Sequence, residues 1–145
     1  MNWKFEAVEK LRQYEAKKQS LKNIPEEIRR LESAMRSIRS ASADGTPVSG
    51  GGSGREDMLL SNIVHREELE RSLEQAQKWV ALVEAGMEIL SQEERLILER
   101  FYIKPEKGAA DRLAGDLNLD VKTVYKRKDA ALRHFTISLY GGVES

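Results

Sequence analysis

Basic side chains gather near the carboxyl end of the chain, at spacings that place them on one side of a helix. Between Val121 and His134 the residues Lys122, Lys126, Arg127, Lys128 and Arg133 are basic, and Asp129 is acidic. With about 3.6 residues per turn, the apolar residues Val121, Val124, Ala131, Leu132 and Phe135 are expected to face inward on one side of this helix. On the opposite side lie Lys122, Lys126 and Arg133, with Thr123 beside them and Tyr125 and Arg127 on the flanks. Cations arranged in this way can contact the phosphates of double-stranded DNA, while the first residues of the helix reach base edges in the major groove.

A charged helix side is often no more than solvated surface, and the basic residues alone would favour that simpler explanation. Three neighbouring features favour DNA binding instead. Asn118 tolerates the left-handed backbone conformation that a tight turn between two helices needs. Asp120 can cap the next helix by accepting a hydrogen bond from a backbone amide. Ala114 is small enough to let the two helices cross closely.

The segments before this helix must position it. Ser91 and Glu94 have the spacing of a capping box, which predicts the start of a helix. Residues 104–108 cannot continue that helix, because they contain a proline and a glycine. A short helix and the turn at Asn118 then follow. We therefore predict a helix-turn-helix DNA-binding domain over residues 91–140, with residues 121–140 as its reading helix.

The chain has 145 residues, of which 24 are basic and 24 acidic, so its formal net charge is zero. Any affinity for nucleic acid must therefore come from local clustering of charge. Charged residues make up 33% and aromatic residues 6% of the chain, which favours a thin aliphatic core. The chain has no cysteine, and no apolar run approaches the ~20 residues that span a bilayer. We expect a cytoplasmic protein that does not enter membranes.

Two long helical stripes precede the basic helix. In residues 1–40 we expect a break near Pro25, followed by a heptad stripe of Ile24, Ile28, Leu31, Met35 and Ile38. Residues 58–90 carry a second stripe of Leu69, Leu73, Ala76, Val80, Val83, Met87 and Leu90. A helix of this length cannot hide its stripe in a small globule, so we expect an antiparallel hairpin or coiled coil, or pairing with another subunit. Gly86 is expected to weaken the second helix and to mark a bend.

Residues 41–57 show no apolar period and contain five of the ten glycines of the chain. This composition is typical of a flexible linker. The glycine run does not match a phosphate-binding loop, because no Lys-Ser/Thr pair follows it.

The sequence offers no catalytic or metal-binding constellation. The two histidines, His65 and His134, lie far apart in sequence. Trp3 and Trp79 are isolated aromatic residues, which we expect to anchor a core or an interface. We therefore expect no enzymatic activity, no metal and no cofactor.

Residues 90–135 resemble region 4 of sigma-70-type factors, the part that reads the −35 promoter element. The resemblance is carried by Leu90, Glu94, Arg95, Ile97, Leu98, Tyr102, Leu113, Ala114, Leu117, Leu119, Thr123, Val124, Ala131 and Leu132. Over nearly its full length, the chain is similar to phage and prophage regulators of the ArpU/RinA type. These join an N-terminal helical pair, a Ser/Gly-rich loop and a second long helix to a sigma-like helix-turn-helix, which implies an all-α fold.

This resemblance implies a sequence-specific regulator of phage or prophage transcription that activates late genes from upstream DNA and contacts host RNA polymerase. The DNA-contacting positions that it implies are Lys122, Thr123, Tyr125, Lys126 and Arg127. No segment resembles sigma region 2, so promoter melting is not expected. We expect a homodimer, because a single reading helix on a neutral chain would bind DNA weakly.

Several positions depart from the sigma pattern. Asn118 stands at the usual turn glycine, and Asp120 stands at the usual capping Ser or Thr. Residues 100–102 read Arg-Phe-Tyr where Leu-Arg-Tyr is common, so the inner side of that helix is expected to be shifted. Lys128 replaces an aliphatic residue, and we expect its stem to lie along the core with the amine in solvent.

Two other functions fit the same pattern. A phage small terminase subunit also joins a helix-turn-helix to oligomerising helices, and it binds DNA to begin packaging. A helical adaptor would instead use the apolar stripes to bind RNA polymerase or a sigma factor, and its helix-turn-helix would be vestigial. A ring of many subunits would favour the terminase, and an absence of crosslinks to DNA would favour the adaptor.

Overall fold

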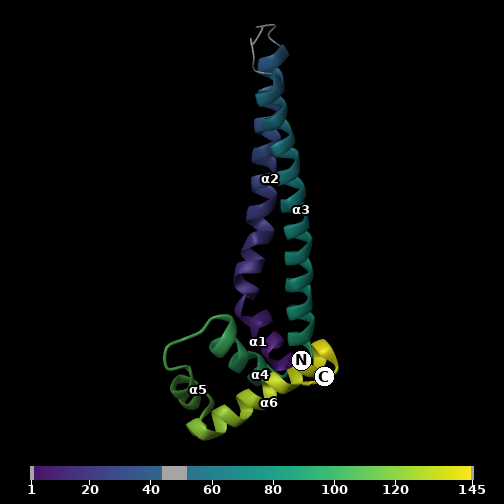
Figure 1. Cartoon of the computed structure of the whole chain (residues 1–145). Helices are drawn as coiled ribbons and strands as arrows, with labels where there is room; N and C mark the ends of the chain where they lie inside the picture. Colours follow the sequence, from purple (N-terminus) through teal and green to yellow (C-terminus); the bar gives the residue numbers. More distant parts are fainter. Residues whose placement is uncertain (1, 44–51, 145) are drawn as a thin grey trace. The chain divides into compact units, whose positions relative to one another are not determined.

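The computed structural model describes residues 2–43 and 52–144, and within these ranges every regular element is a helix (Figure 1). The elements are α1 (Trp3–Arg12), α2 (Tyr14–Ala43), α3 (Gly52–Glu88), α4 (Gln92–Leu98), the π-helical turn η1 (Glu99–Ile103), α5 (Ala109–Leu117) and α6 (Val121–Tyr140). The predicted all-α class is confirmed for the described residues. None of their helices is both long enough and apolar enough to cross a bilayer.

The chain divides into two compact units. Unit 1 comprises Met1–Lys18 and Lys78–Ser145, and unit 2 comprises Gln19–Gln77. This division differs from the predicted boundary at residue 91, because α1 and the end of α3 belong to the same unit as α4, α5 and α6.

Unit 1 holds together around two apolar clusters. The first cluster contains Ala7, Leu11, Val83, Leu90, Leu98, Ala131, Leu132 and Phe135. It therefore joins α1, the end of α3, α4 and α6, and brings both ends of the chain into one core. The second cluster contains Ile97, Leu113 and Val124, one residue each from α4, α5 and α6. This smaller cluster fixes α5 and the start of α6 on α4.

The turn η1 supplies aromatic residues to both clusters. The backbone N–H of Lys104 donates to the carbonyl of Glu99 at 2.8 Å, a bond that spans five residues instead of four. This wider turn rotates the residues that follow it. Phe101 packs against the second cluster, whereas Tyr102 packs against the first. Residues 100–102, where a shifted inner side was expected, lie within this π-helical turn.

Gly86 lies at a close contact between α3 and α6. A Cβ atom at this position would lie 2.8 Å from Cε1 of Phe135 and 2.9 Å from Cδ2 of Leu139. The helix α3 continues past Gly86 to Glu88. Gly86 therefore allows α6 to pack closely against α3 and does not end the helix. The sequence pattern suggested a bend, because it does not reveal that Phe135 and Leu139 pack at this position.

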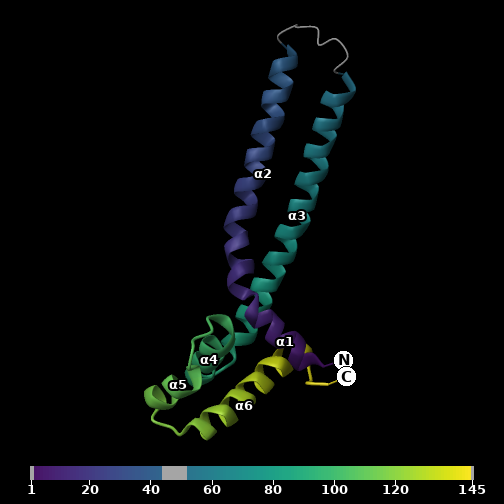
Figure 2. The same cartoon turned by 60° about the vertical axis from the view of Figure 1, so that its left-hand side comes forward.

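In unit 2, the α2 and α3 segments run side by side in opposite directions (Figures 1 and 2). Leu31 and Met35 are buried, as is Asn62 of α3. The Asn62 amide donates to the Leu31 carbonyl at 2.8 Å, and Arg66 donates to the Asn62 side-chain oxygen at 2.9 Å. This buried polar group is satisfied, which removes the desolvation cost it would otherwise carry.

Two predicted boundaries in this region are wrong. Pro25 lies inside α2, and the break comes earlier, at Gln13 between α1 and α2. A proline removes one helical hydrogen bond, but α2 continues through Pro25, and the stripe residues Leu31 and Met35 beyond it are buried. The helices α2 and α3 also extend into the predicted linker 41–57, to Ala43 and from Gly52. The rest of that linker, residues 44–51, lies outside the described residues.

Candidate nucleic-acid interface

A tight turn joins α5 to α6. Asn118 adopts φ 56° and ψ 48°, the left-handed conformation predicted for it. The Leu119 N–H then donates to the Ala114 carbonyl at 2.9 Å and closes the end of α5. Asp120 caps α6, as predicted, by accepting the Thr123 N–H at 2.7 Å. Hydrogen bonds from Thr123 also hold the pKa of the Asp120 carboxyl below its usual value. Both ends of the turn are therefore fixed by local bonds.

One side of α6 is buried and the opposite side is open. The buried side contains Val124, Ala131, Leu132 and Phe135, in agreement with the predicted inner residues. Val121, also predicted to face inward, is 36% exposed. Lys122, Lys126 and Arg133 are exposed, and within the described residues none of these three forms an ion pair. In the described part of the chain, these three side chains therefore form no ion pair on the open side, although the charge of Lys126 helps to lower the pKa of Asp120.

Arg127 differs from these three cations. Its Nη1 donates to Oε1 of Glu93 at 2.6 Å, and both side chains are partly exposed. Glu93 lies in the first turn of α4, where acids are favoured by the positive end of the helix. The predicted DNA contact at Arg127 is thus an ion pair between α4 and α6. The sequence pattern did not suggest this pairing, because 34 residues separate the partners.

A second link between α4 and α6 lies beside the first. Ser91 and Glu94 form the predicted capping box, and the other carboxylate oxygen of Glu94 lies 2.6 Å from Nδ1 of His134. Partial burial acts to raise the pKa of the Glu94 carboxyl. Hydrogen bonds from His134 and Ser91 outweigh that effect, so this pKa lies below its usual value. Glu94 therefore caps α4 and fastens it to α6.

Lys128 lies near three aromatic rings. Its Nζ is 5.0 Å from the ring centroid of Phe101, 5.2 Å from that of Tyr125 and 6.0 Å from that of Tyr102. An ammonium group over ring faces gains cation–π attraction. The turn η1 brings two of these rings to α6. Tyr125, a predicted DNA contact, is 47% exposed beside this cluster.

Arg100 ties η1 to α5. Its guanidinium donates to Asp116 at 2.5 Å and lies 3.8 Å from Glu106. Arg112 of α5 lies 3.9 Å from the same Glu106. These ion pairs connect η1, the loop that follows it and α5.

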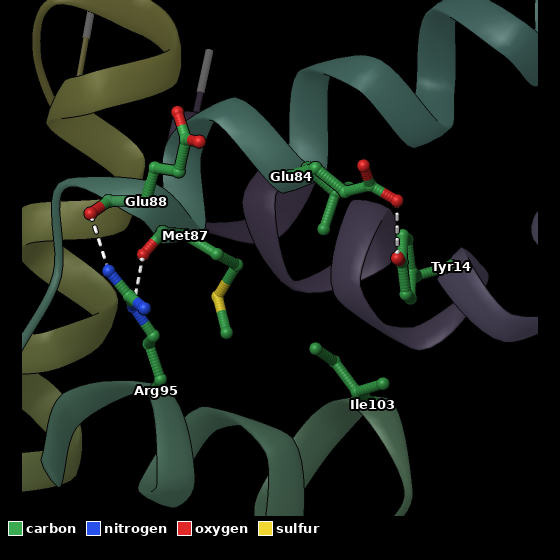
Figure 3. A pocket seen from close by; sticks show the side chains of 7 residues that line it. Tyr14, Glu84, Met87, Glu88, Arg95 and Ile103 are labelled. Atoms are coloured by element: carbon green, nitrogen blue, oxygen red, sulfur yellow. Dashed lines mark hydrogen bonds between the residues drawn. The ribbon is translucent and has the colours of Figure 1, made fainter. Parts of the chain in front are cut away.

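A cleft of about 240 Å³ lies where α3 ends and α4 begins (Figure 3). On one side, the Arg95 guanidinium donates to the carbonyls of Met87 and Glu88 at 2.8 and 2.6 Å. On the other side, the Tyr14 hydroxyl donates to Glu84 at 2.7 Å. Burial, together with Glu84, raises the pKa of Tyr14 to about 12. Hydrogen bonds on both sides of the cleft thus tie the end of α3 to α4 and the start of α2 to α3. With this raised pKa, Tyr14 stays protonated at neutral pH.

Within residues 2–43 and 52–144, no cluster of His, Asp or Glu side chains could hold a metal ion. No family model matches the chain, and neither the curated proteins nor the solved structures include a match.

Proposed function

We propose that this protein is a sequence-specific DNA-binding regulator of phage or prophage transcription, in which α5 and α6 form a helix-turn-helix. The observation that carries the proposal is the surface of α6. One side of this helix is buried in two apolar clusters, and the other presents Lys122, Lys126 and Arg133 without ion-pair partners among the described residues. Exposed cations on a helix held rigidly after a short turn are suited to reading the major groove.

In this mechanism, the first turns of α6 enter the major groove. Lys122 and Lys126 contact base edges or phosphates, and Tyr125 lies on the flank of the same surface. Arg127 contributes only when it leaves Glu93, since its guanidinium is already bound by a carboxylate. The resemblance to ArpU/RinA-type regulators supports activation of late genes, with host RNA polymerase as a further partner.

Unit 2 supplies the oligomerisation surface in this proposal. A single α6 offers few cations on a chain of zero net charge. Two copies linked through their paired helices would bind two half-sites at once and gain affinity from the linkage. The functional assembly that we propose is therefore a homodimer on double-stranded DNA.

Genome-wide crosslinking of the full chain to DNA would test this function and supply the operator. With that operator, the Lys122→Ala/Lys126→Ala protein should bind more weakly, by about 1–3 kcal/mol for each lysine that is bidentate to guanine. The slope of log affinity against log salt should also become shallower, by about 0.9 for each lost phosphate contact. Lys18→Ala, which removes an exposed lysine from α2, is the matched control. Equal affinities of the double variant and the wild type at low salt would contradict the proposal.

A further inference from the structure

The exposed side of α6 extends well beyond the first turn of the helix, which is the part placed next to the α5–α6 turn. At about 100° per residue, Lys122, Lys126, Arg133 and Tyr140 lie within about 40° of one another around the helix. The distance along the axis from Lys122 to Arg133 is about 16 Å, which exceeds the ~12 Å width of the major groove. If the first turn of α6 reaches base edges, the part near Arg133 therefore reaches the phosphates that border the groove.

The first turn of α1 is fastened to the far end of the same side. The Trp3 ring stacks on Tyr140, with centroids 4.7 Å apart and planes at 22°. The Trp3 N–H also donates to the Val143 carbonyl at 3.1 Å. Asn2 caps α1 by accepting the Lys4 N–H at 3.0 Å. The position of Lys4 relative to α6 is thus set by a ring stack and by backbone bonds.

Lys4 and Arg133 line one open cleft of about 360 Å³. Asp129 and Glu144 line it as well, so the cleft has two cations and two carboxylates. Within the part of the chain that the structure describes, no ion pair involves Lys4 or Arg133. Both cations therefore remain available to an external anion, although the two carboxylates lower the local potential.

We infer that the first turn of α1 belongs to the DNA-binding surface, and that Lys4 and Arg133 hold backbone phosphates where α6 leaves the major groove. This inference rests on the proposed function and extends its surface from one helix to two. Lys4 is a phosphate contact, so it contributes to affinity without reading sequence. Asp129 opposes the same phosphates, and its neutralisation strengthens binding.

The test uses the full chain and a mixed-sequence duplex of about three helical turns, with binding followed by fluorescence anisotropy from about 50 to 200 mM salt. The variants are Lys4→Gln and Arg133→Gln, which keep most of the side-chain stem, and Lys18→Gln as the control. Thermal melting by circular dichroism confirms that each protein is folded. Lys4→Gln and Arg133→Gln should each make the log–log salt slope shallower by about 0.9. Lys18→Gln should leave the slope unchanged, Lys4→Arg should restore it, and Asp129→Asn should raise affinity.

Wild-type slopes for both Lys4→Gln and Arg133→Gln, together with weaker binding by Lys122→Ala/Lys126→Ala, would overturn this inference and leave the proposed function standing. Wild-type binding by all of these variants would overturn both.

Tryptophan emission gives a second measurement. Addition of DNA should change the emission of the wild-type protein, and Trp3→Phe should abolish that change, because Trp3 adjoins the inferred contact. A change that persists in Trp3→Phe would also contradict the inference.

Discussion

At the scale of single residues, the role of a cation on α6 depends on the carboxylates within its reach. Lys126 and Arg127 are neighbours in sequence and both are exposed. Arg127 is bound to Glu93 at 2.6 Å, whereas no ion pair of Lys126 occurs among the described residues. A phosphate that approaches Arg127 must compete with a carboxylate already in place. The two cations therefore differ in their availability to DNA.

Glu93→Gln should release Arg127 and strengthen DNA binding. The lost ion pair is partly exposed and contributes only about 0–1 kcal/mol to folding, so the variant should remain folded. Its log–log salt slope should become steeper by about 0.9 if Arg127 then contacts one phosphate. Glu99→Gln, which removes an exposed acid from η1, serves as the control in the same anisotropy titration. Weaker binding by Glu93→Gln alone would mean that Glu93 orients Arg127 toward the DNA.

The sequence predicted those residue-scale features that depend on neighbours along the chain. Three such features are confirmed: the Asp120 cap, the Ser91/Glu94 capping box and the left-handed Asn118. They could be predicted because each depends only on residues within three positions in the sequence. The environment of Lys128 was not predicted. Two of its three rings come from η1, and no periodic pattern indicated that a π-helical turn would rotate them toward α6.

At the scale of elements, α4 and α6 are joined through Glu94, which makes their contact sensitive to pH. The folded protein holds the pKa of Glu94 below the usual 4.5. The unfolded chain therefore binds a proton at a higher pH than the folded protein does. The stabilisation is fully present above about pH 4.5 and is lost as the pH falls through the lower, folded pKa.

Urea unfolding from neutral pH down to acid pH should therefore show a falling free energy of unfolding below about pH 4.5. Glu94→Gln should reduce stability at neutral pH and flatten part of this fall. Asp120, whose pKa is also lowered, contributes in the same direction, so the fall should not vanish in this variant. A pH dependence of Glu94→Gln identical to that of the wild type would exclude Glu94 as a source of this linkage.

Two glycines in helices should respond to alanine in opposite ways. At Gly86 a new Cβ would lie 2.8 Å from Phe135, and overpacking of this kind costs about 1–3 kcal/mol. Most of this range exceeds the gain of about 1 kcal/mol from helix propensity, so Gly86→Ala should destabilise the fold. At Gly115 of α5 the added Cβ would meet no atom within 4 Å beyond the local backbone of its own helix, so Gly115→Ala should stabilise the fold by about 0.5–1 kcal/mol. Chemical denaturation measures both, and stabilisation by Gly86→Ala would contradict the close contact between α3 and α6.

At the scale of the whole chain, the pattern showed which residues turn inward but not which elements they meet. Residues of α1 pack with Phe135 in one cluster, although more than a hundred positions separate them in sequence. The helix α2 also continues through Pro25, where local chemistry suggested a break. Local signals therefore predicted the helices and their caps, while the division into units depends on contacts between distant segments.

The proposed homodimer requires an apolar surface on unit 2 that its own packing does not use. On α3, Leu60 is 60% exposed and Val64 is 44% exposed. They are four residues apart, so they share one side of the helix. That side lies about half a turn from Asn62, which points at α2 and donates to Leu31. The pair is therefore free to pack against a second copy.

Leu60→Glu/Val64→Glu should convert the dimer to a monomer, since the charges would be buried at the interface but solvated on a free chain. The change of mass is measured by light scattering after size-exclusion chromatography. Ser72→Glu, which adds a charge at another exposed position of α3, should leave the mass unchanged.

The monomer should lose up to about 10²–10⁴-fold in affinity for a duplex with two half-sites, because only linked copies gain from the second site. Its affinity for a single half-site should stay the same. A wild-type protein that is a monomer in this measurement would contradict the dimer, and a variant that stays dimeric would place the interface elsewhere.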